Sequence, residues 1–153
     1  MQLGRTGALI GIAAMLGLSV QVAAETSAED AKKYRVSIMT ALKGHIGAAS
    51  MTVRGLVDDN GQLAGHAAGL VSGTAELNNI FQEGSAVDDS EALPSIWEQP
   101  EKFAAAMKQA QEATVAFQEA VAGGDSEAIG AAFRSMGKSC GGCHDDFREE
   151  HDH

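Results

Sequence analysis

The chain has 153 residues, a length that suits one domain with its own hydrophobic core. Eleven Lys and Arg against 21 Asp and Glu give a formal net charge of −10. This acidic balance argues against a nucleic-acid partner, because phosphates are neutralised by basic side chains, but it permits docking to a basic protein.

Residues 1–24 have the pattern of a secretory signal peptide. Arg5 supplies the positive charge, residues 8–20 form an uncharged apolar run, and Val22 and Ala24 place small residues where cleavage before Glu25 requires them. The run is shorter than the ~20 residues that span a bilayer, so a retained membrane anchor is the less favoured alternative. We therefore expect a soluble, exported protein of the periplasm without a stable anchor. Its mature chain, residues 25–153, is expected to be a single domain with a formal charge of −11.

Apolar residues recur at alternating steps of four and three in four stretches, which predicts four helices packed nearly parallel. The stripes are Met39, Leu42, Ile46, Ala49, Val53 and Leu56; Leu63, Ala67, Leu70, Thr74, Leu77 and Phe81; Phe103, Met107, Ala110, Thr114, Phe117 and Val121; and Ile129, Phe133, Met136, Cys140, Cys143 and Phe147. No stretch has a convincing strand pattern. The predicted fold is all-α, an antiparallel four-helix bundle.

The connections between these stretches agree with that fold. The turn residues 58–61 and 123–126 are short breaks, so the first and second helices, and the third and fourth, should be antiparallel neighbours. The connection over 84–100 is longer and contains Pro94 and Pro100, so it is not a continuous helix. We expect it to wrap one end of the bundle.

Near the C-terminus, the last predicted helix carries the pentapeptide Cys140-Gly141-Gly142-Cys143-His144, with the only two cysteines of the chain. A CxxCH motif indicates covalent attachment of a c-type haem. Two thiols at i and i+3 lie on one helix face and can reach both vinyl groups of one porphyrin, and His144 can approach the iron as an axial ligand. Because both cysteines continue the inner stripe, the haem should lie inside the bundle.

Two other uses of these cysteines are weaker alternatives. A redox-active CxxC motif usually belongs to a βαβ fold, which is not predicted here. Two Cys and one His could also hold zinc, but a structural zinc site needs a fourth ligand, which His151 or His153 of the tail could supply.

The mature chain resembles the cytochrome c′ family, the class II c-type cytochromes. The resemblance lies in Ala31-Lys32-Lys33-Tyr34-Arg35, in Leu93-Pro94-Ser95-Ile96-Trp97, and in the closing helix from Ala131 to Arg148 with its CxxCH motif. It implies a four-helix bundle that carries one haem c and its iron, attached by thioether links. The position of the motif close to the C-terminus, followed by Phe147-Arg148, is more specific than CxxCH alone.

In this family, the residue four positions after the Tyr-Arg arginine covers the haem face opposite the histidine. Here that residue is Met39, whose thioether can bind iron. The resemblance then implies a six-coordinate iron between His144 and Met39, in a one-electron carrier between exoplasmic donor and acceptor proteins. The alternative is a five-coordinate cytochrome c′ that binds NO or CO. Other residues that remain open as the sixth ligand are His45, His66, Met107 and Met136.

No enzymatic activity is expected. A haem peroxidase would need a distal acid–base group, and no good candidate lies near Met39 on the first helix.

Two arginines are also expected near the haem. Arg35 continues the inner stripe of the first helix, and a buried guanidinium needs a partner. The resemblance supplies a haem propionate for Arg35 and places Arg148 near the proximal His144.

The resemblance also allows a homodimer through the first and second helices. The small residues Gly44, Gly47 and Ala48 either serve that contact or face a neighbour within the bundle.

Overall fold

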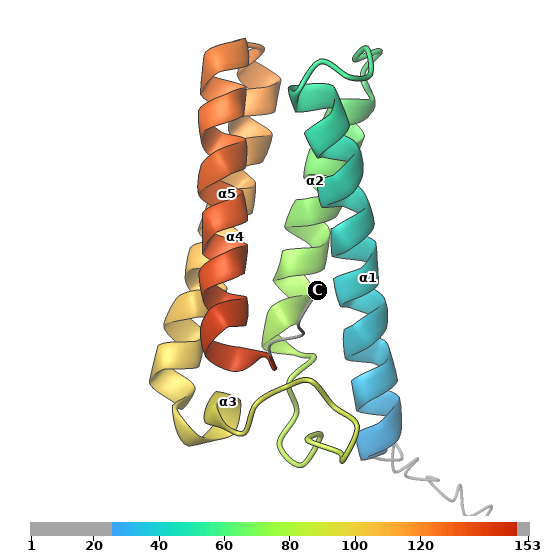
Figure 1. Ribbon diagram of the computed structural model, residues 1–153, viewed down its shortest axis with the longest axis vertical. Coiled ribbons are helices and arrows are strands. Elements are labelled where there is room, and N and C mark those ends of the chain that lie inside the picture. The colour runs from blue at the N-terminus through green and yellow to red at the C-terminus, as the bar shows by residue number, and fades with distance from the viewer. Residues whose placement is uncertain (1–25, 150–153) are drawn as a thin grey trace, which may run out of the picture.

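The computed structural model describes residues 26–149, and over that range it is helical apart from turns and one isolated bridge. The helices are α1 (Ala28–Val53), α2 (Gln62–Ala75), the 3₁₀ turn η1 (Glu76–Asn78), α3 (Ser95–Glu98), α4 (Pro100–Gly123) and α5 (Ser126–Phe147). Figure 1 shows the four long helices side by side and the short α3 at one end. The predicted all-α four-helix bundle is confirmed. The proposed signal peptide, residues 1–24, lies outside the described residues.

Local chemistry sets the ends of the long helices. The hydroxyl of Ser27 accepts a hydrogen bond from the amide of Asp30 and caps α1, and the Asp125 carboxylate caps α5 by accepting from the amide of Ala128 at 2.8 Å. Between α4 and α5, Gly124 adopts φ +75°, a left-handed conformation that glycine enters without steric cost.

Two predicted stripes extend beyond the helices that carry them. α1 ends at Val53, so Leu56 lies in the following turn and is 60% exposed rather than in the core. The second stripe continues past Ala75 only through the 3₁₀ turn, so Phe81 belongs to the connection and not to a helix. In both places the apolar residues keep the helical spacing beyond the point where the helix ends.

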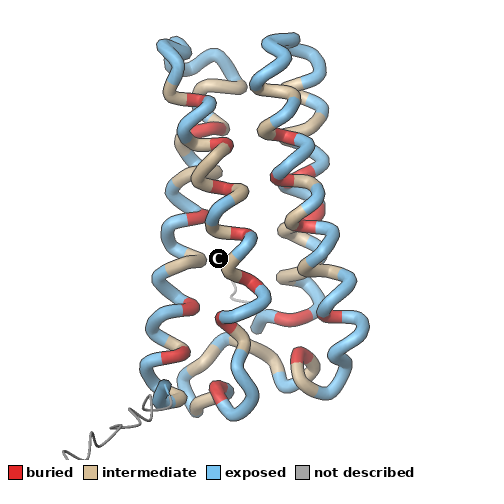
Figure 2. The backbone as a smooth tube through the Cα atoms, turned by 180° about the vertical axis from the view of Figure 1, so that it is seen from behind, coloured by how far each residue is buried: buried red, intermediate tan, exposed pale blue. Residues whose placement is uncertain are grey.

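The core runs along the inner faces of the four long helices, where buried positions recur turn by turn (Figure 2). Phe117 and Met136 are fully buried, and the rings of Phe117 and Phe133 pack edge-on with 5.5 Å between their centres. α1 packs closely on α2, α2 on α4, and α4 on α5, whereas α1 and α5 touch each other only slightly. Of these neighbouring pairs of long helices, α1 and α5 therefore pack least closely.

The connection between η1 and α4 wraps one end of the bundle, as expected (Figure 1). It is tied to the end of α5, because the amide of Leu93 donates to the carbonyl of Phe147 and the amide of Glu149 donates to that of Glu91. The indole of Trp97 donates to the carbonyl of Gln82 at 3.2 Å and packs at this end of the bundle. This part of the bundle is closed by the chain itself.

Candidate haem site

The CxxCH motif lies in the last two turns of α5. Cys140 packs at the edge of the main core cluster, which contains Phe117 and Met136. Cys143 packs one turn further along, against the cluster that contains Phe103 and Phe147. Both thiols are half-buried and free. The two cysteines thus lie along the inner side of α5, as a covalent link to a group inside the bundle requires.

Burial sets the protonation of the three motif side chains. It raises the pKa of Cys140, and it raises that of Cys143 to about 11, with smaller contributions from Cys140 and Asp146. The pKa of His144 is lowered, mainly by burial and to a smaller extent by the positive charge of Arg148. A neutral imidazole has a free lone pair, so His144 is suited to bind iron.

The two alternative uses of the cysteines receive no support from this environment. Thiols with raised pKa values are poor nucleophiles at neutral pH, unlike the activated thiolates of redox CxxC motifs. Within residues 26–149, no three His, Cys, Asp or Glu side chains are grouped so that they could hold a metal ion. The proposed zinc ligands His151 and His153 lie outside the described residues.

Met39 lies on α1 and is half-buried. It packs against the main core cluster and also against the neighbouring cluster of Leu77, Ile80 and Ala110. α1 carries Met39, α5 carries the CxxCH motif, and these two helices have the slightest contact among the long neighbours in the bundle. The two free thiols on the inner side of α5, the His144 imidazole that follows them and the slight contact between α1 and α5 together fit a haem.

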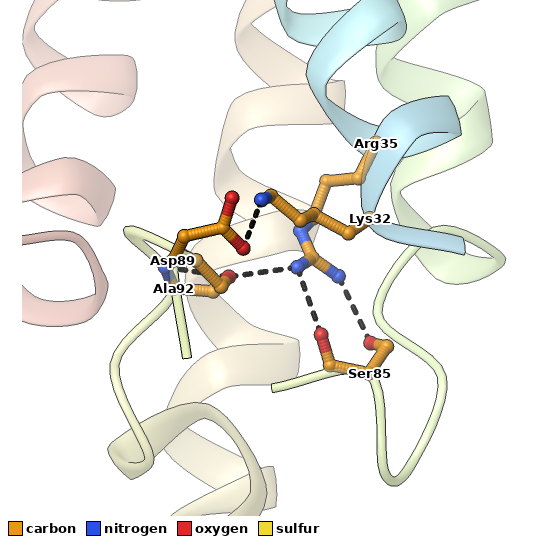
Figure 3. Close-up of polar contacts among 6 residues, drawn as sticks. Lys32, Arg35, Ser85, Asp89 and Ala92 are labelled. Carbon is orange, nitrogen blue, oxygen red and sulfur yellow. Dashed lines mark hydrogen bonds and ion pairs between the residues drawn. The ribbon is translucent and has the colours of Figure 1, made fainter. Parts of the chain in front are cut away.

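Arg35 is buried on α1, with 4% of its surface exposed (Figure 3). Nη1 donates to the carbonyl of Ile80 at 3.3 Å and to Oγ of Ser85 at 2.9 Å. Nη2 donates to the carbonyl of Ser85 at 3.1 Å and to Oγ of Ser90 at 2.9 Å. The guanidinium also lies 5.4 Å from the ring centre of Phe81. The partners of this buried charge are therefore in the connection, and a contact with a haem propionate stays a prediction.

Arg148 follows α5 directly and is exposed. Its backbone amide donates to the carbonyl of His144 at 3.0 Å, and it forms the isolated bridge with Ala92. Since the positive charge of Arg148 also lowers the pKa of His144, the two side chains are electrostatic neighbours.

The other potential iron ligands have different surroundings. His45 on α1 and His66 on α2 face each other, with 3.1 Å between their Nδ1 atoms. Met136 is fully buried in the main core cluster, and Met107 packs between the two smaller clusters. The pairing of the two histidines was missed from the sequence. The short connection between α1 and α2 is a signal for it, because antiparallel helices bring residues near a turn together.

The small residues of α1 do not all face the bundle. A Cβ added at Gly44 or Gly47 would have no atom within 4 Å, so these glycines do not make a close helix contact within the chain. Among the described residues, no helix is both long enough and apolar enough to cross a bilayer.

Comparison with known proteins identifies the family of the chain. The family model described as Cytochrome C′ matches residues 30–148. Cytochrome c-554 of Cereibacter sphaeroides is 34% identical over 140 residues, covering 84% of this chain and 91% of the relative. Cytochrome c′ of Rhodospirillum rubrum is 30% identical over 141 residues, covering 91% of this chain and 96% of the relative.

A solved structure with the same fold is a nitric oxide complex of a variant cytochrome c prime from Alcaligenes xylosoxidans, with a TM-score of 0.77 and 29% identity. It covers 84% of this chain and all of that one. Cytochrome c′ of Rubrivivax gelatinosus has a TM-score of 0.75 and 28% identity, with coverage of 80% and 97%. The two cysteines of the CxxCH motif are consistent with covalent attachment of haem c, and we conclude that the chain belongs to the cytochrome c′ family and that its cofactor is covalently bound haem c.

Proposed function

We propose that this c-type cytochrome binds a small diatomic gas, NO or CO, at its haem iron on the side opposite His144. The observation that carries the proposal is the match to cytochrome c prime of Alcaligenes xylosoxidans, whose solved structures include nitric oxide complexes and a carbon monoxide complex of variants. The relatives thus support the gas-binding alternative better than the His/Met electron carrier.

A bound haem would supply an iron centre that can change oxidation state or take up a small ligand. The chain provides the neutral imidazole of His144 on α5 for one side of the iron. On α1, the stripe residues that follow Met39 are apolar, Leu42 and Ile46, whereas the guanidinium of Arg35, which precedes Met39, is hydrogen-bonded to the connection. An apolar lining favours a neutral diatomic over water and offers no acid–base group for peroxide chemistry.

A second function, one-electron transfer with Met39 as the sixth ligand, is favoured by one observation. Met39 is the inward-facing thioether of α1, whereas Met51 on the same helix is 48% exposed. A thioether opposite a histidine raises the reduction potential relative to harder ligands and can hold iron in both oxidation states. The acidic surface would then favour docking to basic donor and acceptor proteins.

The proposal includes export to the periplasm, supported by the signal-peptide pattern of residues 1–24.

The proposal also includes a homodimer through α1 and α2. Support for the dimer comes from the outer side of α1, where Gly44 and Gly47 face open space and Val36 and Met51 are 53% and 48% exposed.

The test is an absorption spectrum of the purified haem-loaded protein, ferric and ferrous, with and without CO and NO. Wild type is compared with Met39→Leu, which keeps the apolar volume but cannot bind iron, and with Met107→Leu, an inward methionine of α4. Gas binding predicts that the ferrous wild-type spectrum shifts on adding CO or NO, and that neither substitution abolishes the shift. A wild type that responds to neither gas would refute the proposal.

The same spectra also test the alternative function, one-electron transfer. If Met39 is a ligand, wild type is low-spin and Met39→Leu alone becomes high-spin and open to CO. If Met39→Leu leaves the spin state unchanged, one-electron transfer through a His144/Met39 iron is wrong. Met107→Leu should resemble wild type in both cases.

A further inference from the structure

A pair of histidines lies between α1 and α2, outside the haem site described above. His45 and His66 are half-buried, their ring centres are 5.4 Å apart, and their Nδ1 atoms are 3.1 Å apart. Within residues 26–149, each imidazole has the other as its only hydrogen-bond partner. In a hydrogen bond between two Nδ1 atoms one ring donates its N–H and the other accepts with its lone pair, and which ring donates depends on the tautomer.

We propose that His45 and His66 form a second metal site, in which a divalent transition-metal ion replaces the shared proton and binds both Nδ1 atoms. Zinc–imidazole bonds are about 2.0–2.1 Å long, so two nitrogens 3.1 Å apart subtend an angle of roughly 100° at an ion. That angle lies between the right angle of a square-planar site and the angle of a tetrahedral one. A small rotation of the two rings turns both lone pairs toward the ion, and water completes the coordination.

The position of the pair is fixed by the packing of the two helices. Gly69 of α2 lies directly against the His45 ring, and a Cβ at this position would come within 2.4 Å of Nε2 of His45. The absence of a side chain at Gly69 makes room for the ring on α2, beside His66. Both ligands thus come from long, well-packed helices, which hold a metal site more accurately than loops do.

The ligand chemistry selects the class of ion. Imidazole nitrogen suits Cu²⁺, Zn²⁺ and Ni²⁺, whereas Mg²⁺ and Ca²⁺ prefer oxygen ligands. Among these ions, Cu²⁺ should bind more tightly than Zn²⁺, following the general order of divalent metals. Because the described part of the chain offers no third side-chain ligand here, the site should exchange its ion readily with a chelator.

The experiment measures Zn²⁺ and Cu²⁺ bound to the ferric, haem-loaded protein by equilibrium dialysis and metal analysis. His66→Gln is the main variant, since His45 packs so closely on Gly69 that replacing it disturbs the helix contact. The double variant His151→Ala/His153→Ala is the matched control, because those tail histidines are the competing ligands in the sequence. Haem absorption and far-UV circular dichroism report whether each variant is folded.

The site predicts one ion per chain, at least about tenfold weaker binding in His66→Gln, and unchanged binding in the tail variant. The thermal midpoint of wild type should also rise with added Zn²⁺, because an ion that binds only the folded state stabilises it, and this rise should disappear in His66→Gln. Binding that survives His66→Gln, or that is lost with the tail histidines, would overturn the proposal. So would a thermal midpoint that does not respond to the ion.

Discussion

Replacing Arg35 by methionine tests what this buried charge does. The substitution keeps most of the apolar stem but removes the guanidinium, whose two terminal nitrogens make four hydrogen bonds to the connection. Burial lowers the pKa of Arg35, but an arginine remains charged at neutral pH. The substitution therefore removes a buried charge and the donors of all four hydrogen bonds.

The structure indicates the size of the effect. Two of the acceptors, Ser85 Oγ and Ser90 Oγ, keep other partners, because the first donates to the carbonyl of Gln82 and the second accepts from the amide of Ala92. The carbonyls of Ile80 and Ser85 lose this donor. Each unsatisfied buried acceptor costs about 1–3 kcal/mol, and relief from burying a charge offsets part of this. We expect Arg35→Met to lower the free energy of unfolding by about 3 kcal/mol.

The assay is denaturant unfolding of the haem-loaded protein, followed by far-UV circular dichroism. The matched control is Lys32→Met, one turn away on α1, which breaks an ion pair to Asp89 in the same connection. Because the Asp89 side chain is 77% exposed, this control should cost less than about 1 kcal/mol. If Arg35→Met costs no more than Lys32→Met, Arg35 does not hold the connection. If it instead changes the haem spectrum and potential at unchanged stability, the propionate expectation is the better account.

Two further pairs of substitutions test the packing. Gly73→Ala puts a Cβ 2.6 Å from the Leu42 side chain and should lower the free energy of unfolding by about 1–3 kcal/mol. Its control, Gly44→Ala, puts a Cβ where no atom lies within 4 Å and should stabilise α1 by about 0.5–1 kcal/mol, so equal midpoints of the two variants in thermal unfolding would contradict this packing. Phe117→Ala empties a fully buried position and should cost about 3–5 kcal/mol, against at most ~0.5 kcal/mol for Val115→Ala at a position 41% exposed. Similar losses in chemical unfolding would show that Phe117 is not in the core.

Much of the architecture could be predicted from local patterns. The apolar stripes identified Leu70, Phe117 and Met136 as inward residues, and all three are fully buried. The prediction failed for Leu56, because a helical period in the sequence continues even where the backbone leaves the helix at Val53. Periodicity reports the face of a residue and not the end of its helix.

The sequence alone determined the helical fold, the inward side of each helix and the CxxCH motif, since these depend on residues a few positions apart. Only the tertiary structure decided which distant groups meet. Arg35 finds its partners 45 to 55 residues along the chain, and His45 meets His66 across two helices. Such contacts depend on helix register and on the path of the connection, which are set by the packing of the whole bundle rather than by any short segment.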